Sequence, residues 1–175
     1  MGASASVAIY KACEVASALT QKGYVVRVAL TPSAARLVSP LLFRSVTGQP
    51  ACADEFGPDA PSSMTHIEFA DSADLFLAAP ATADLVARLA QGMADDLVTT
   101  TVLALKPEAK KILAPAMNAR MLAHPLVQKN LATLRENGWQ VIEPEAGHLA
   151  CGVHGEGRLA APAKIVEAVE RALAS

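Results

Sequence analysis

Apolar residues along the chain follow two patterns, short continuous runs and longer stretches with helical spacing. The run at 73–80, ADLFLAAP, is nearly all apolar and ends at a proline, which is typical of a strand buried on both faces of a parallel sheet. The stretch at 83–92 has helical spacing and a glycine stop, which predicts a helix. Further strands are predicted at 24–30, 110–118 (running into a loop) and 139–144, and further helices at 14–23, 95–105, 125–138 and 162–175.

This alternation of strands and helices predicts a single α/β domain over residues 1–175, with a doubly wound parallel sheet and helices on both faces. The first predicted helix follows so close to the start of the sequence that we expect a severely shortened first strand, or a sequence that starts inside that strand. The segment 53–64 is rich in Gly, Pro and Ser and is the predicted mobile loop.

Charge and cysteine content exclude several classes of protein. The net charge is −2, from 15 basic and 17 acidic residues, and no basic stripe indicates a nucleic-acid partner. No apolar run is long enough to cross a bilayer, and no signal-peptide pattern opens the sequence. Cys13, Cys52 and Cys151 are too few and too scattered for a disulfide framework, which predicts a reducing, cytoplasmic setting. Cys13 and Cys52 lie among apolar residues and are predicted to be packed thiols.

Polar residues follow several predicted strands, where ligands of doubly wound sheets bind. Each of them could simply cap the next helix, and capping alone is the simpler interpretation of any single one. Several together at one sheet edge favour a ligand. The segments concerned are Thr31–Ser33, Pro80–Asp84, Pro115–Asn118 and the loop around Cys151.

Small residues from Gly2 to Ser6 precede the first helix. Backbone N–H groups at a helix start, with the hydroxyls of Ser4 and Ser6, would suit a phosphate group. The dinucleotide pattern G-x-G-x-x-G is absent, so a single phosphate, as on a mononucleotide, is the more economical interpretation. A serine-capped helix without a ligand stays open as the alternative.

The glycine-rich stretch 147–162 contains Cys151, an unusual place for either a core thiol or a structural disulfide. His148, Cys151 and His154 are spaced by three residues, which raises the alternative of a metal site. A structural zinc site needs four ligands and no fourth is evident, so no metal is predicted.

Four segments together resemble the homo-oligomeric flavin-containing cysteine decarboxylases. They are GASASVAIYK at 2–11, the long run 66–97 around APATADL, APAMNARM at 114–121 and ACGVHGEGRL at 150–159. The resemblance covers nearly the whole chain and implies a flavodoxin-like, Rossmann-like fold that binds FMN. It also implies trimers, or dodecamers built of trimers, with FMN at subunit interfaces and a histidine contributed by a neighbouring chain. The family often has glycine where this chain has Ala5.

Residue by residue, the resemblance implies that His66 is the catalytic base, that Asn118 holds the substrate carboxylate, and that the Cys151 thiol completes the reaction. In the same way, the implied FMN-binding residues are Ser4, Ala5, Ser6, Val7, Thr31, Ser33, Ala81, Thr82, Ala83, Asp84 and Ala116. The implied substrate-binding residues are Met117, Asn118, Ala150, Gly152 and Arg158.

The residues Thr82-Ala83-Asp84 form a version of the family motif that resembles the one in the coenzyme A branch of the family. The expected reaction is therefore decarboxylation of 4′-phosphopantothenoylcysteine to 4′-phosphopantetheine, with a separate phosphopantothenoylcysteine synthetase as a candidate partner. Three alternatives stay open: oxidative decarboxylation of a peptide's C-terminal cysteine, a non-catalytic flavin-binding regulatory subunit, and a flavin prenyltransferase. The missing acidic tails argue against the regulatory subunit, and the PAMN and Cys151 motifs argue against the prenyltransferase.

Overall fold

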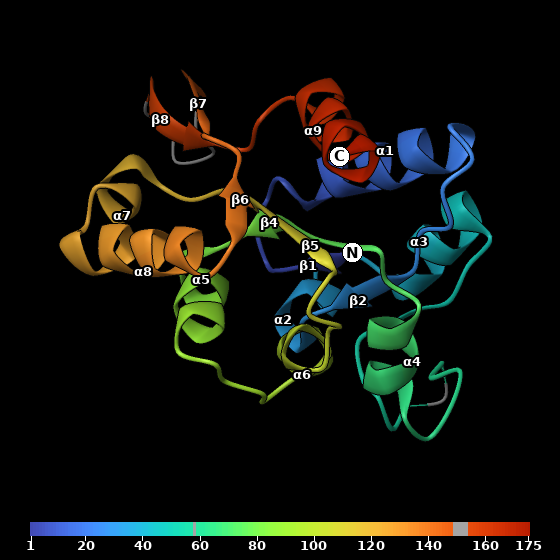
Figure 1. Ribbon diagram of the computed structural model, residues 1–175. Helices are drawn as coiled ribbons and strands as arrows, with labels where there is room; N and C mark the ends of the chain where they lie inside the picture. The colour runs from blue at the N-terminus through green and yellow to red at the C-terminus, as the bar shows by residue number, and fades with distance from the viewer. Residues whose placement is uncertain (58, 149–153) are drawn as a thin grey trace.

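The computed structural model describes residues 1–57, 59–148 and 154–175 and contains a six-stranded parallel sheet (Figure 1). The strand order is β3-β2-β1-β4-β5-β6, so the direction of winding reverses between β1 and β4. This order confirms the predicted doubly wound fold, and it places the expected ligand crevice at the carboxyl ends of β1 and β4. The strands are β1 (Gly2–Ala3), β2 (Val28–Leu30), β3 (Ala51–Cys52), β4 (Leu75–Ala81), β5 (Lys110–Pro115) and β6 (Trp139–Val141).

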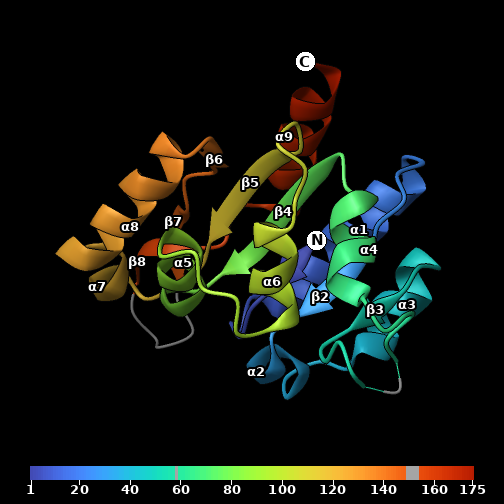
Figure 2. The same ribbon diagram turned by 60° about the horizontal axis from the view of Figure 1, so that its bottom comes forward.

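Helices cover both faces of the sheet, as Figure 2 shows most clearly. One face packs against α1 (Ile9–Gln21), α3 (Pro40–Thr47) and α9 (Pro162–Ala174). The opposite face packs against α4 (Thr65–Asp71), α5 (Ala83–Ala90), α6 (Leu97–Leu103) and α8 (Pro125–Glu136). Two short helices, α2 (Pro32–Ala35) and α7 (Ala119–Leu122), follow β2 and β5. Among the helices of the described residues, none is long and apolar enough to span a membrane.

Glycine stops set the ends of two helices as the sequence predicts. Gly23 follows α1 with φ of 90°, and Gly138 follows α8 with φ of 81°. Both values lie in the left-handed region, where glycine carries no steric penalty from a Cβ atom. The chain can therefore reverse sharply after each helix and enter the following strand.

The predicted strand at 24–30 is wrong in its first half. Only Val28–Leu30 form β2, because the neighbouring strands β1 and β3 are two residues long and pair with these three residues. A strand needs backbone partners, and within the described sheet residues 24–26 have none, while Arg27 only accepts from the N-terminal amine of Met1. The prediction of a short strand that runs into a loop at 110–118 is confirmed, since β5 ends at Pro115 and no strand or helix covers 116–118. The very short first strand is confirmed as well. Mobility of the segment 53–64 stays a prediction.

The described parts of the glycine-rich stretch form an antiparallel hairpin, β7 (Glu145–His148) and β8 (His154–Arg158). Gly157 fixes this hairpin against the residues that follow β5. The Met117 N–H donates to the Gly157 carbonyl at 2.9 Å. A Cβ atom at Gly157 would lie 2.2 Å from the Met117 carbonyl oxygen, so only glycine allows this approach.

Candidate active site

A cleft of about 550 Å³ lies at the carboxyl ends of β1, β4 and β5, beside the point where the strand order reverses. The turn after β1 and the start of α1 form one side, and the segment after β5, with α7 and β8, forms the other. Its lining residues are Ala5, Ser6, Val7, Ala8, Tyr10, Lys11, Thr82, Ala116, Met117, Asn118, Met121, Gly157, Arg158 and Leu159. A second hollow of about 340 Å³ lies at the opposite edge of the sheet, and no predicted site residue lines it.

Ala5, Ser6 and Val7, in the turn between β1 and α1, line one side of the cleft. The hydroxyl of Ser6 accepts from the Ala8 N–H at 3.2 Å, so this serine shapes the start of the helix. The N-terminal end of α1, a helix of 13 residues, lines the cleft, so the positive end of the helix dipole faces the cleft and favours an anion there. The structure thus places three of the four predicted residues of this turn in the cleft.

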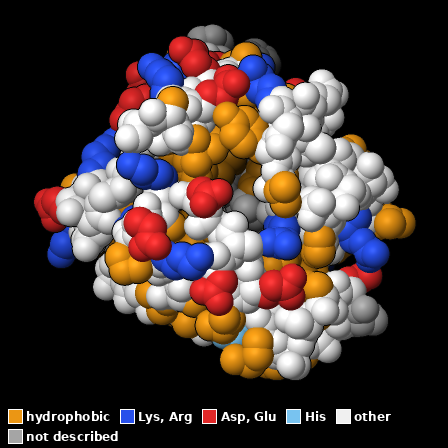
Figure 3. All heavy atoms as spheres, turned by 45° about the vertical axis from the view of Figure 1, so that its right-hand side comes forward, with side chains coloured by type: hydrophobic (Ala, Val, Ile, Leu, Met, Phe, Trp, Pro, Cys, Tyr) orange, Lys and Arg blue, Asp and Glu red, His pale blue; other side chains and the backbone are white. Residues whose placement is uncertain are grey.

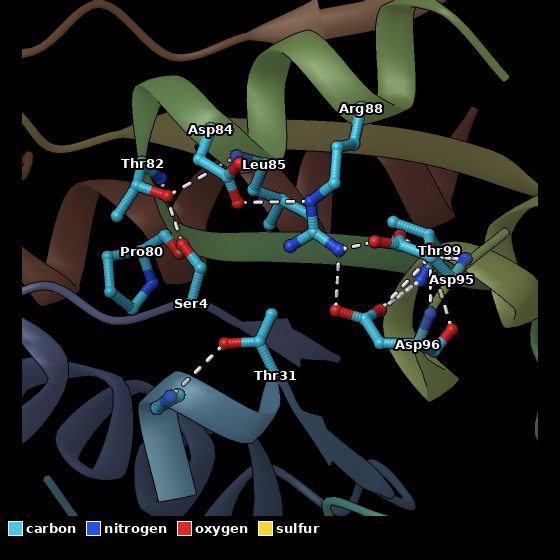
Figure 4. A network of polar contacts seen from close by, with 11 residues as sticks. Ser4, Thr31, Pro80, Thr82, Asp84, Leu85, Arg88, Asp95, Asp96 and Thr99 are labelled. Atoms are coloured by element: carbon cyan, nitrogen blue, oxygen red, sulfur yellow. Dashed lines mark hydrogen bonds and ion pairs between the residues drawn. The ribbon is translucent and has the colours of Figure 1, made fainter. Parts of the chain in front are cut away.

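The fourth residue of this turn, Ser4, is 2% exposed and has a structural role. Its hydroxyl donates to the Pro80 carbonyl at 2.8 Å and accepts from the Thr82 N–H at 2.9 Å (Figure 4). These two bonds join the end of β1 to the end of β4. Ser4 does not line the cleft, and its hydroxyl positions the turn at Thr82 instead.

Three predicted site residues cap helices. The Thr31 hydroxyl accepts from the Ala34 N–H at 3.2 Å, the Thr82 hydroxyl caps α5 at 3.3 Å, and the Asn118 oxygen accepts from the Arg120 N–H at 2.8 Å. The capping interpretation therefore holds for all three, but Thr82 and Asn118 also line the cleft. Capping fixes the orientation of Thr82 and Asn118 in the cleft. Five other residues predicted to bind FMN do not line the cleft: Thr31, Ser33, Ala81, Ala83 and Asp84.

Arg88 ties α5 to the start of α6 behind the Thr82 turn (Figure 4). Its guanidinium bonds Asp84 at 3.0 Å, Asp95 at 2.9 Å and Asp96 at 2.7 Å. Asp96 in turn caps α6 by accepting from the Thr99 N–H at 2.9 Å. Burial opposes the charge on Arg88, yet the bonds to Asp96 and Asp95 outweigh it and raise the pKa of Arg88. The hydrogen bond from Arg88 lowers the pKa of Asp95.

The cleft is cationic. Lys11, in the first turn of α1, is only 8% exposed and lines the cleft, and the exposed Arg158 lines its other side. No acidic residue occurs among its described lining residues. Tyr10, Met117 and Met121 add apolar surface. Such a site suits a ligand with an apolar body and negatively charged groups. No sequence signal marks Lys11 as a site residue, because a lysine in a helix normally indicates solvent exposure.

The family model described as Flavoprotein matches residues 1–174. The chain belongs to the Flavoprotein family. It is 46% identical over 168 residues to the coenzyme A biosynthesis bifunctional protein of Bacillus subtilis (strain 168), covering 96% of this chain but 41% of that relative's length. It is 40% identical to a probable phosphopantothenoylcysteine decarboxylase of Streptococcus mutans, covering 99% of this chain and 97% of the relative.

Solved structures of other proteins are similar to this chain over nearly its whole length. A mutant PPC decarboxylase in complex with pantothenoylaminoethenethiol superimposes with a TM-score of 0.88 at 28% identity, covering 99% of this chain and 96% of that one. The FMN-binding protein AtHal3 gives a TM-score of 0.83 at 29% identity, covering 97% and 92%. The flavodoxin-like, Rossmann-like fold that the resemblance implies is thereby confirmed.

Within this flavoprotein chain, His66 lies apart from the cleft. It stands in the first turn of α4, on the other side of the molecule from α7, and it lines no part of the cleft (Figure 2). Its neighbours Phe56, Met64 and Ile67 are exposed. Figure 3 shows apolar side chains exposed among charged ones on the side of the molecule that carries α3 and α4. His66 could act only in the cleft of another copy of the chain, because it lies away from its own.

The predicted residues Ala150, Cys151 and Gly152 lie outside the described residues, so their roles stay predictions. The same holds for the expected absence of a metal, since the alternative site included Cys151. Among the residues that the structure describes, no group of three metal-binding side chains occurs. Cys52 is buried, as predicted, and Cys13 is half-buried.

Proposed function

We propose that the chain catalyses the FMN-dependent decarboxylation of 4′-phosphopantothenoylcysteine to 4′-phosphopantetheine. The observation that carries this proposal is the cleft itself, which joins an anion-binding helix start to the segment that presents Asn118. The names of the relatives support the same reaction. A separate phosphopantothenoylcysteine synthetase stays the expected partner, and the cytoplasmic setting stays a prediction.

The cleft fits FMN in charge and size. Its volume of about 550 Å³ lies within the usual range of cofactor sites. The phosphate would bind at the turn of Ala5, Ser6 and Val7, where backbone amides and the dipole of α1 favour an anion. The apolar side chains of Met117 and Met121 would contact the ring system. Ala5 in place of glycine still leaves this turn lining the cleft.

Loss of CO₂ leaves electrons on carbon, and bound flavin supplies the required electron sink by taking up an electron pair and returning it later. The chain's own residues bind and orient the substrate. The Asn118 amide can donate N–H groups to the substrate carboxylate, and it adds no positive charge that would retain CO₂. Arg158 offers a cation for the substrate phosphate. The Cys151 thiol supplies a proton to the product carbon in the last step.

We further propose that the base is His66 of a neighbouring copy in a trimer, or in a dodecamer built of trimers. The separation of His66 from its own cleft supports this arrangement. The exposed Phe56, Met64 and Ile67 provide apolar surface for the contact. Co-expression of a His66→Asn chain with an Asn118→Asp chain tests it. Random trimers would regain about a quarter of the normal sites, whereas either variant alone would stay inactive.

The decisive assay incubates the purified protein with FMN and 4′-phosphopantothenoylcysteine and measures CO₂ and 4′-phosphopantetheine. A peptide ending in cysteine serves as the competing substrate. Turnover of the small molecule supports the proposal. Turnover of the peptide alone, or flavin binding without any CO₂ release, would refute it in favour of the alternatives.

A further inference from the structure

The ring of His66 is hydrogen-bonded to a carboxylate that no sequence motif marks. Nδ1 of His66 lies 2.6 Å from Oε2 of Glu55, which precedes it by 11 residues in the segment between β3 and α4. Both side chains are only 20% exposed. A short contact between two largely buried groups has a more fixed geometry than an ion pair in full solvent.

Local bonds hold the segment that carries Glu55. The Asp54 carboxylate accepts from the Phe56 N–H at 3.0 Å and closes a turn around Glu55. At the other end, the Thr65 hydroxyl donates to the Ser62 carbonyl at 2.7 Å, directly before His66. Glu55 and His66 are therefore each held by a local hydrogen bond, one at either end of the segment between them.

The contact decides which ring nitrogen of His66 carries the proton. An ionised carboxylate can only accept, so the hydrogen in this bond belongs to Nδ1 of the imidazole. In the neutral ring the lone pair then resides on Nε2, the nitrogen that points away from Glu55. A carboxylate behind an imidazole fixes the tautomer and orientation of the ring, and it stabilises the imidazolium that forms when Nε2 takes up a proton.

We infer that Glu55 is a positioning residue, which holds His66 with Nε2 as the acceptor for a proton of the substrate. The use of His66 as a base rests on the proposed function, but the tautomer does not. The inference does not depend on whether His66 serves its own copy or a neighbouring one.

The tautomer can be measured directly by magic-angle-spinning ¹⁵N NMR of protein labelled at its four histidines. A His66→Asn sample identifies the signals of His66. At pH 8.5 we expect the Nδ1–H tautomer in the wild type. In Glu55→Ala the signals should shift towards the Nε2–H tautomer. In Glu55→Gln, whose amide oxygen still accepts from Nδ1, the wild-type tautomer should persist.

Decarboxylation kinetics provide the second readout. Glu55→Ala should lower kcat by about 10- to 100-fold with little change in KM, as is typical when a partner behind a functional histidine is lost. Glu55→Gln should fall between Glu55→Ala and the wild type. Asp59→Ala is the matched control, because it removes a carboxylate from the same segment without touching His66. It should leave both the tautomer and kcat unchanged.

An unchanged tautomer or an unchanged kcat in Glu55→Ala would overturn the inference. Equal effects of Asp59→Ala would also overturn it, since loosening of the segment would then explain the loss. If the wild type has no decarboxylase activity, the proposed function fails, while the NMR result still decides whether Glu55 sets the tautomer of His66.

Discussion

The backbone N–H of Thr82 donates a hydrogen bond of 2.9 Å to the hydroxyl of Ser4, across the point where β1 and β4 end. The same hydroxyl donates to the Pro80 carbonyl at 2.8 Å. One buried serine thus joins the two strands between which the sheet reverses its order. The floor of the cleft depends on this junction, because Thr82 lines it and caps α5.

Replacing Ser4 by alanine should destabilise the protein by about 1–3 kcal/mol, because it leaves the N–H of Thr82 without its partner. Flavin binding should weaken as well, since the turn beside the phosphate site loses its anchor. Urea unfolding and fluorimetric FMN titration would measure the two effects. Ser45→Ala is the control, because that exposed hydroxyl only bonds back within α3. A Ser4 variant as stable as this control would contradict the assigned role.

Gly157→Ala should separate the β7–β8 hairpin from the segment Pro115–Asn118. A Cβ atom 2.2 Å from the Met117 carbonyl oxygen cannot be accommodated, and the φ of 116° is strained for any other residue. We expect a loss of about 2–4 kcal/mol in unfolding free energy, together with loss of decarboxylation.

Gly48→Ala is the matched control for this substitution. It has a positive φ of 65° but no atom within 4 Å of the added methyl group, so it should cost about 1 kcal/mol. Similar losses in the two variants, measured by urea unfolding, would show that backbone strain alone acts at Gly157.

Much of the fold could be predicted from local signals. The apolar run ending at Pro80 gave β4, and the glycines after α1 and α8 marked their ends. The helix α3 was missed although its signals are present. Ser39 caps it, Pro40 occupies its first position and Gly48 adopts the left-handed conformation after it. The lengths of β1 and β3, by contrast, depend on pairing between distant segments, which no local pattern reveals.

The candidate site could be predicted only in part, for a similar reason. Residues after the strands converge on the cleft because parallel strands end at one edge, and Ala5, Thr82 and Asn118 follow this rule. Which way a side chain turns there is a tertiary property. Ser4 faces β4 instead of the cleft, and Lys11 faces the cleft instead of solvent. Neither orientation has a signature in the sequence.

Arg88→Met should destabilise the protein by about 2–3 kcal/mol at pH 7. Most of this comes from Asp96, whose side chain is 5% exposed and would lose its cation. Arg44→Met, which breaks an exposed pair with Asp59, should cost less than about 1 kcal/mol. Urea unfolding of both variants and the wild type compares them. Equal losses would contradict the importance of burial.

The loss in Arg88→Met should also depend on pH, because Arg88 lowers the pKa of Asp95 in the folded protein. A lowered carboxyl pKa contributes stability that is present above the unfolded-state value, near 4, and that disappears as pH falls through the folded-state value. The difference between wild type and variant should therefore be largest at neutral pH and shrink below pH 4. A difference that grows on acidification would contradict this linkage.

Cys52 should be inert in the native protein. Burial raises the pKa of its thiol to about 11, so at pH 7.5 nearly all of the thiol is protonated and unreactive. Iodoacetamide should therefore leave Cys52 unmodified in folded protein and alkylate it in urea, as mapped by mass spectrometry of its peptide. Rapid native labelling would show that the strand end at β3 opens readily.

Lys11→Met should weaken substrate or flavin binding without unfolding the protein. The side chain is 8% exposed and lines a cleft whose described walls contain no acidic residue, so its charge is available to an anionic ligand. Methionine preserves much of the apolar stem and removes only the ammonium group. We expect a rise of about 10-fold or more in KM or in the Kd for FMN, the size typical of one charge-assisted hydrogen bond.

The control for Lys11 is Lys22→Met on the same helix, which removes an exposed pair with Glu170 and should leave both constants unchanged. Titrations with riboflavin and FMN then locate the interaction. A Lys11 variant that loses affinity for FMN alone places the ammonium group near the cofactor phosphate. A loss confined to KM places it near the substrate. If neither constant changes, Lys11 contributes only the packing of its stem, and the cationic character of the cleft rests on Arg158 and the dipole of α1.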